Sequence, residues 1–170
     1  MRGRAVILTT LAIVFSPVAA SAEQRSAAVF DFELVDTSWA DPLKAPDAEH
    51  QSRMTQASER LRARLTESGR YRMVDIAPVA GQAHASNLQA CGGCDVTLAD
   101  RVGAELAVTG SVHKVSNLIL NMTIFVRDAK TGGNVVVMQA SMRGDTDESW
   151  LRAVDWLVRN RLLAETGAAR

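Results

Sequence analysis

The spacing of apolar residues changes partway along this chain, and that change limits its fold more than any other feature. Residues 47–69 carry apolar side chains at helical spacing, whereas 104–112, 117–127 and 134–142 have the composition and pattern of consecutive strands. Helices that alternate with strands indicate parallel pairing, and consecutive strands indicate antiparallel hairpins. The chain is therefore expected to form a mixed sheet with helices packed on it.

The predicted order is strand, helix, strand, two short helices, three strands and a final helix. This is an α/β (α+β) architecture with a mixed sheet of about five strands. The long helices are expected to pack on one face of the sheet. The elements before the three consecutive strands are expected at 27–35 (strand), 47–69 (helix), 71–76 (strand), 78–90 and 95–102 (both short helices).

The two ends of the first long helix and its buried side can be predicted. It should begin near Asp47 and end at Gly69, because the residue just past a helix often adopts the left-handed conformation that Gly tolerates. Arg53 and the other charged residues of this helix are expected to face solvent. Its buried stripe is expected to be Met54, Ala57, Leu61 and Leu65.

The chain begins with the layout of a secretory signal peptide. Two arginines open a short uncharged run, 5–20, and the small-residue site Ala20-Ser21-Ala22 follows. A retained membrane anchor is disfavoured, because spanning a bilayer takes about 20 apolar residues. We therefore expect residues 1–22 to be removed on export to the periplasm and residues 23–170 to form one α/β domain.

Charge and length narrow the classes of function. Removal of the leader leaves 148 residues, the usual size of one domain, with 17 basic against 19 acidic side chains. A near-neutral chain without a basic stripe argues against nucleic-acid binding, which depends on clustered Lys and Arg. No second long apolar run follows the leader, so no membrane insertion is expected after cleavage.

Cys91-Gly92-Gly93-Cys94 is the one compact chemical motif. In an oxidising compartment, Cys91 and Cys94 are expected to form a structural disulfide that closes a small loop. The alternative is a thiol-disulfide redox site, because a helix start lowers the pKa of a thiol. The surroundings favour the structural bond, since redox catalysts of this type place the pair directly after a strand, and Leu88-Gln89-Ala90 precedes it here.

No metal site or cofactor is expected. His50, His84 and His113 fall on three different predicted elements, and no two of them have the spacing of a metal-binding pair. His84 is the nearest of them in sequence to the cysteines. All three imidazoles are therefore expected to be exposed or half-buried.

Two groups of carboxylates could in principle act as a catalytic pair. The second group is better explained by the last helix, with Asp145 as its N-cap and Glu148 completing a capping box. That helix should bury Trp150 and the apolar residues that follow it. Signatures of serine hydrolases, phosphate loops and dinucleotide sites are absent, so a non-enzymatic protein is predicted. The two groups are Asp31, Glu33 and Asp36, and Asp145, Asp147 and Glu148.

The loop at 36–47 has no periodicity and contains Trp39 and Pro42. A Trp in such a loop is either packed onto the core or presented to a partner, and Trp is enriched at binding hot spots. Trp39 and Pro42 are therefore the candidate partner-binding residues.

Five segments carry a family resemblance: 28–32 (AVFDF), 68–75 (SGRYRMVD), the Cys91–Cys94 motif, 103–112 (GAELAVTGSV) and 126–132 (VRDAKTG). Together they resemble a secreted proteobacterial family of unknown function, domain of unknown function 3280, with 2380 as a near neighbour. More distantly, the chain is similar to the amino-terminal domain of TolB and to the periplasmic domain of the curli secretion lipoprotein.

The resemblance implies a TolB-N-like sheet domain that makes protein contacts in cell-envelope assemblies, and it carries over no catalytic residues. The chain lacks the lipid-attachment Cys of the secretion lipoprotein, which argues against a pore-forming role. We therefore predict a periplasmic interaction or accessory module whose partner is another periplasmic or envelope protein. The family's link to periplasmic oxidative metabolism implies service to a secreted dehydrogenase system.

Overall fold

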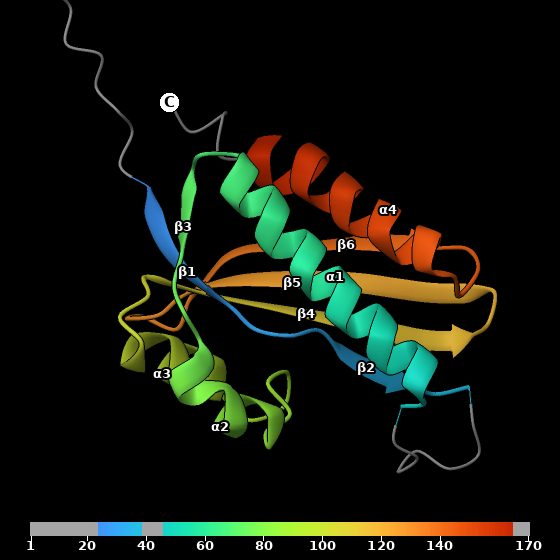
Figure 1. The fold of residues 1–170 in the computed structure, drawn as a ribbon, viewed down its shortest axis with the longest axis horizontal. Helices are drawn as coiled ribbons and strands as arrows, with labels where there is room; N and C mark the ends of the chain where they lie inside the picture. Colours follow the sequence, from blue (N-terminus) through green and yellow to red (C-terminus); the bar gives the residue numbers. More distant parts are fainter. Residues whose placement is uncertain (1–23, 39–45, 165–170) are drawn as a thin grey trace, which may run out of the picture.

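The computed structural model describes residues 24–38 and 46–164, and it contains a mixed sheet with helices on both faces (Figure 1). The elements are β1 (Arg25–Val29), β2 (Glu33–Asp36), α1 (Ala48–Glu67), β3 (Tyr71–Met73), the 3₁₀ turn η1 (Ala77–Val79), α2 (Ala80–His84), α3 (Cys94–Arg101), β4 (Leu106–Ser116), β5 (Ile119–Asp128), β6 (Asn134–Met142), α4 (Asp147–Leu157) and the π-helical turn η2 (Val158–Leu162).

The strand order is β3-β1-β4-β5-β6, and β2 pairs with β4 beyond the end of β1. β1 runs parallel to both β3 and β4, and β2 also runs parallel to β4. β4, β5 and β6 form two successive antiparallel hairpins. The predicted mixed sheet and the predicted order of elements are confirmed.

The single strand expected at 27–35 is divided in two, which makes the sheet six-stranded. The N–H of Phe30 still bonds to Val108 of β4, but the N–H of Phe32 bonds to the Ser58 hydroxyl of α1 at 2.9 Å. As a result Phe30 and Phe32 pack into different cores on opposite faces. One regular strand over 27–35 would place both on the same side as Leu34, but regular alternation does not continue through the break.

Phe32 lies directly over Gly110 of β4. A Cβ built on Gly110 would overlap the Phe32 ring, so only Gly allows the ring to sit at this position. This close approach fixes where the chain re-enters the sheet as β2.

One face of the sheet is covered by the two long helices, as predicted. Figure 1 shows α1 and α4 side by side across this face. Trp150 is fully buried beneath α4, whereas Leu151 is half-buried. The main core contains the whole predicted stripe of α1: Met54, Ala57, Leu61 and Leu65.

The opposite face is covered only in part, by α2 and α3. A second, smaller core forms there between these helices and the strands β1 and β4. It includes Ala28, Phe30, Leu98, Ala99 and Ala107. The far half of this face, over β5 and β6, leaves several apolar side chains exposed, among them Ile119, Val135 and Val137.

The predicted start of α1 is confirmed, because the Asp47 carboxylate accepts the N–H of His50 as an N-cap. Gly69 follows the helix with φ +66°, as its proposed role requires. The predicted capping box of α4 was wrong. Thr146 is the N-cap and Ser149 completes the box, and Asp145 lies one residue earlier with a different role.

Within residues 24–38 and 46–164, none of the helices has the length and apolar content needed to cross a bilayer.

Candidate functional site

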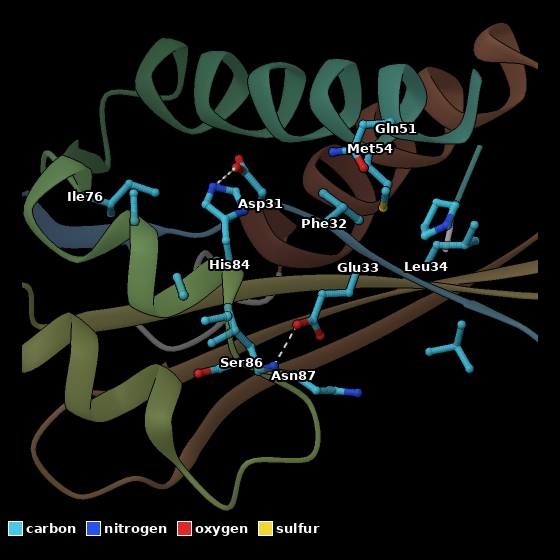
Figure 2. Close-up of a pocket in the computed structure, with 16 residues that line it drawn as sticks. Asp31, Phe32, Glu33, Leu34, Gln51, Met54, Ile76, His84, Ser86 and Asn87 are labelled. Carbon is cyan, nitrogen blue, oxygen red and sulfur yellow. Dashed lines mark hydrogen bonds and ion pairs between the residues drawn. The ribbon is translucent and has the colours of Figure 1, made fainter. Parts of the chain in front are cut away.

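A groove of about 440 Å³ runs along β2, and we call it the β2 groove. It is bounded by residues 31–35, by Gln51 and Met54 of α1, and by residues 83–88 at the end of α2 and in the loop that follows. Figure 2 shows how these three segments surround the opening. Buried apolar side chains form its floor: Phe32, Met54 and Leu88.

Glu33 holds one wall of the groove to the strand. Its carboxylate accepts the N–H of Leu88 at 2.7 Å and that of Gln89 at 3.3 Å. Burial raises the pKa of Glu33 above its ordinary value, and the two N–H donors offset this effect only in part. The carboxylate therefore positions the loop after α2 against β2.

Asp31 lies at the opposite end of the groove. Arg62 of α1 donates to its carboxylate at 2.6 Å and also to the carbonyl of Val29 at 2.9 Å. His84 lies 3.5 Å from the second carboxylate oxygen, but its imidazole is 64% exposed, so this pair contributes little to stability. Figure 2 shows Asp31 and His84 facing one another across the rim.

The outer edge of β2 is open along the groove. In the described part of the sheet, β2 pairs with β4 alone. The N–H of Thr37 donates to the carbonyl of Lys114 on β4. Because the backbone groups of successive residues alternate in direction, the N–H and C=O of Val35 point toward β4 and those of Leu34 point toward the groove. An apolar floor beside an open strand edge is an arrangement that can bind side chains and backbone of another polypeptide.

The polar groups of the groove are engaged in holding its walls. Besides the contacts of Glu33 and Asp31, the Ser86 hydroxyl donates to the carbonyl of Gln82 at 2.9 Å. In the part of the chain that the structure describes, no group of three or more His, Cys, Asp or Glu residues could hold a metal ion.

A second notable site is a buried cluster of charges made by His50 and Arg53 of α1, Lys114 of β4 and Asp145 before α4. We call it the buried cluster. Asp145 is at its centre, with His50 Nε2 and Lys114 Nζ each 2.8 Å from one carboxylate oxygen. The other oxygen accepts from Arg53 at 3.2 Å and from the Trp150 indole at 3.0 Å. The cluster thus joins the starts of α1 and α4 to β4.

The environment of Asp145 strongly favours its charged form. Burial alone would raise the pKa of Asp145, but hydrogen bonds from Lys114, His50 and Trp150 outweigh it and lower the pKa to about 2. Lys114 is only 3% exposed, and Asp145, at 2.8 Å, is the nearer of the two carboxylates that compensate its charge, the other being Asp36 at 3.8 Å.

This cluster was not predicted from the sequence. His50 was expected to be exposed or half-buried and Arg53 to face solvent, but their exposed fractions are 7% and 6%. One signal was available, because Lys114 follows the buried Val112 by two residues and so occupies an inward position of its strand. A Lys at such a position requires a buried carboxylate partner.

The structure separates the three histidines. His50 lies in the buried cluster, His84 lines the β2 groove, and His113 contacts the Thr37 hydroxyl at 3.0 Å. Cys91 and Cys94 are joined by a disulfide with 5.7 Å between their Cα atoms, and Cys94 is the first residue of α3.

Trp39 and Pro42, the predicted partner-binding residues, lie outside the described residues. Their segment connects β2 to α1, and the described residues on its two sides, Val35 and Pro46, both line the β2 groove. Of the first predicted group of acids, Asp31 and Glu33 line the groove.

A sequence model of the family described as protein of unknown function (DUF2380), DUF3280, matches residues 25–162. The chain belongs to this family. The match confirms the resemblance that the sequence motifs indicated, and it covers all the strands of the described sheet. Among curated proteins, none matches the chain.

Several solved structures share the fold. The C-terminal domain of LpoB from Escherichia coli is 14% identical with a TM-score of 0.51, over 73% of this chain and 86% of that chain. The lipoprotein GNA1162 from Neisseria meningitidis is 16% identical with a TM-score of 0.50, over 82% and 99% of the two chains. TolB from Acinetobacter baumannii also matches, at 11% identity and a TM-score of 0.39, over 83% and 30%.

Proposed function

We propose that this protein is a non-enzymatic accessory module of the periplasm that acts by binding another envelope protein through the β2 groove. The observation that carries the proposal is the open backbone edge of β2 beside an apolar floor. Extended segments of partner proteins bind at such edges, where main-chain hydrogen bonds give affinity and pockets give specificity.

The charges of the groove support a binding role. Glu33 is tied to two backbone N–H groups and Asp31 to Arg62, so both carboxylates are used to shape the walls. A groove with fixed walls loses little conformational freedom when a partner binds, which favours affinity.

Trp39 and Pro42 are proposed to add to the partner contact. Val35 and Pro46, described residues before and after their segment, both line the groove. We expect Trp39→Ala to weaken capture of the partner without lowering the stability of the protein, because hot-spot side chains act mainly in the complex. A Trp39 packed onto the core would instead cost stability on substitution.

Site-specific photocrosslinking in the native host tests the proposal. Gln51, which is exposed and lines the groove, is replaced by p-benzoylphenylalanine, and the exposed Ser52, which does not line it, is replaced as the matched control. We expect a single protein adduct from position 51 and none from position 52. Equal adducts from both positions, or none from either, would overturn the binding role of the groove.

Export is proposed on the leader sequence and can be checked with the same material. Native protein from the periplasmic fraction is expected to begin at Glu23 by N-terminal sequencing. A secreted dehydrogenase system is the first place in which to seek the crosslinked partner, because the family resemblance pointed there.

The alternative function is a thiol-disulfide redox protein that uses Cys91 and Cys94. The observation in its favour is that Cys94 opens α3, the position at which a helix end lowers the pKa of a thiol. Turnover in an insulin-reduction assay would support this alternative, and a bond that resists strong reductant would exclude it.

A further inference from the structure

A second groove, of about 660 Å³, lies between the outer edge of β6 and the exposed side of α4. We call it the β6–α4 groove. It is far along the sheet from the β2 groove, because β6 is the last strand in the order and α4 lies over it (Figure 1). Residues 139–143 form one wall, and Arg152, Trp156 and Arg159 form the other.

The backbone of β6 is open on this side. The N–H of Asp128 bonds to Gly133 on the β6 side of β5, so alternation makes Val126 and Val136 a hydrogen-bonded pair. Every second residue of β6 after Val136, starting at Val137, therefore directs its N–H and C=O away from β5, and no described residue bonds to these groups. These residues are Val137, Gln139 and Ser141.

β6 also lacks the usual protection of an edge strand. Edge strands are commonly guarded by charged residues, by Pro or by a covering segment. The nine residues of β6, Asn134–Met142, include neither a charged residue nor Pro, and Val135 and Val137 are 43% and 49% exposed. Such an edge is ready to accept another strand.

Both walls of the groove carry cationic side chains. Arg143 of the strand wall and Arg159 of the helix wall make no ion pair or side-chain hydrogen bond with any residue in the described ranges. Arg152 is paired with Glu148, but both side chains are largely exposed, so this weak ion pair can give way to one between Arg152 and a carboxylate of a partner. The carboxylate in the groove, Asp155, is already bound by two arginines of α1, which lower its pKa.

Trp156 supplies an apolar contact in the same wall. It is 41% exposed, and the Arg161 guanidinium lies 5.7 Å from its ring centre. Exposed Trp beside unpaired Arg is the side-chain combination that is enriched at binding hot spots.

We propose that the β6–α4 groove binds an extended acidic segment of a partner protein, which adds to β6 as a further strand. Backbone groups of the segment pair with Val137, Gln139 and Ser141. Its carboxylates are bound by the arginines at the groove, and an apolar side chain between them packs on Trp156. This inference adds a second binding site, with its own chemistry, to the one in the proposed function.

A second copy of the chain is a poorer occupant than an acidic segment. Pairing of β6 with the same edge of another copy would bring α4 against α4, and Arg152 and Arg159 of one copy toward those of the other. Like charges across an interface oppose association, whereas carboxylates in the groove are attracted.

Binding is tested on the full mature chain with a fluorescent peptide in which every second residue reads Glu, Val, Glu, so that carboxylates and an apolar side chain share one face of the added strand. It is followed by anisotropy and by intrinsic tryptophan fluorescence. One control peptide has Lys in place of Glu, and another has alternate amides N-methylated so that it cannot pair with an edge strand. We expect binding of the first peptide alone. No binding at concentrations up to about 1 mM would overturn the proposal, as would equal binding of a control peptide.

Two variants separate the charge contribution from the backbone contribution. Arg159→Glu is expected to weaken binding about tenfold or more, whereas Arg72→Glu, on β3 at the opposite edge of the sheet, leaves it unchanged. Gln139→Pro removes one outward N–H and is expected to lower affinity similarly with the fold retained, because Pro is tolerated at open edges. Peptide affinity unchanged in both Arg159→Glu and Gln139→Pro would refute the site.

Failure of the β6–α4 groove to bind a peptide and failure of the β2 groove to bind a partner are measured separately. Photocrosslinking at Gln51 reports on the β2 groove, and Arg159→Glu leaves that readout unaffected. Sedimentation measurements address the other occupant. A stable dimer that excludes the peptide, and that persists in Arg159→Glu, would assign this edge to a second copy and overturn the proposal.

Discussion

Replacement of Asp145 by Asn is expected to destabilise the protein more than any change to an exposed ion pair. The substitution keeps the shape of the side chain but removes the charge at the centre of the buried cluster. Lys114, which is 3% exposed, would then keep only Asp36, at 3.8 Å, as an ion-pair partner. Arg53 would lose its contact with Asp145 and keep those with Glu49 and Asp147. Removing one partner of a buried pair leaves an uncompensated charge, which is the costly event.

The magnitude follows from the pKa of Asp145. A fall from 3.8 to about 2 corresponds to roughly 2 kcal/mol of preferential interaction with the ionised form. The buried cations left behind bring the expected loss in unfolding free energy to about 3–5 kcal/mol. A domain of this kind has about 5–15 kcal/mol in total, so the variant remains measurable but much weaker.

The pH dependence gives a second measure. Because the folded-state pKa of Asp145 lies below its unfolded value, its contribution is present above about pH 4 and is lost as the pH falls toward 2. The wild-type protein should lose about 2 kcal/mol from this group over that interval. Asp145→Asn has no such group and should show a correspondingly flatter profile.

Urea denaturation of five proteins, the wild type, Asp145→Asn, Lys114→Met, their combination and Glu148→Gln, tests the reasoning across that pH range. Glu148→Gln is the matched control, because its ion pair with Arg152 is exposed and its removal should cost less than about 1 kcal/mol. Lys114→Met combined with Asp145→Asn should cost less than the sum of the single changes, since it removes both charges. A loss below about 1 kcal/mol for Asp145→Asn, or strict additivity of the pair, would refute the account.

Three further changes test other features of the fold, each by urea denaturation. Gly110→Ala should cost about 1–3 kcal/mol, because the added methyl meets the Phe32 ring; a neutral effect would contradict the close packing at the strand break. Cys91→Ser with Cys94→Ser should cost about 2 kcal/mol or less, since the closed loop is short; a larger loss would indicate a wider structural role. Thr146→Ala should cost about 1 kcal/mol through loss of the α4 cap, and no change would restore Asp145 as the capping residue.

The sequence allowed prediction of the elements whose pattern is local. The stripe of α1 repeats at helical spacing, and β6 was predicted with the bounds 134–142 that the structure gives. The Asp47 cap and Gly69 could be predicted for the same reason, because each acts on its neighbours in the chain.

The features that were missed depend on distant partners. His50 and Asp145 are 95 residues apart in sequence, and the residues around each of them do not indicate that the two side chains are in contact. Asp is a residue type favoured at N-caps, so the sequence pointed to Asp145, and only the tertiary structure shows that Thr146 is the N-cap. The break before β2 is similar, since it depends on Ser58 of α1 and Gly110 of β4 meeting Phe32.

The grooves were predicted only in part. Asp31 and Glu33 were noted as acids near the first strand, and the structure places both on the wall of the β2 groove. Trp150 and Trp156 are six residues apart on one helix and so cannot both face inward, and Trp156 is the exposed one. Which strand edges stay open is a property of the whole sheet, so it could not be read from any one segment.

The position of β1 between β3 and β4 has a consequence for the timing of folding. The first strand of the chain is an interior one, and its Ser26 bonds to Glu105, 79 residues later. Contacts between such distant residues form slowly, because a long loop must close before any of them is gained. A nascent chain therefore cannot complete its sheet until most of its length has been synthesised, and under the proposed export this delay keeps the polypeptide unfolded enough to pass through a translocation channel.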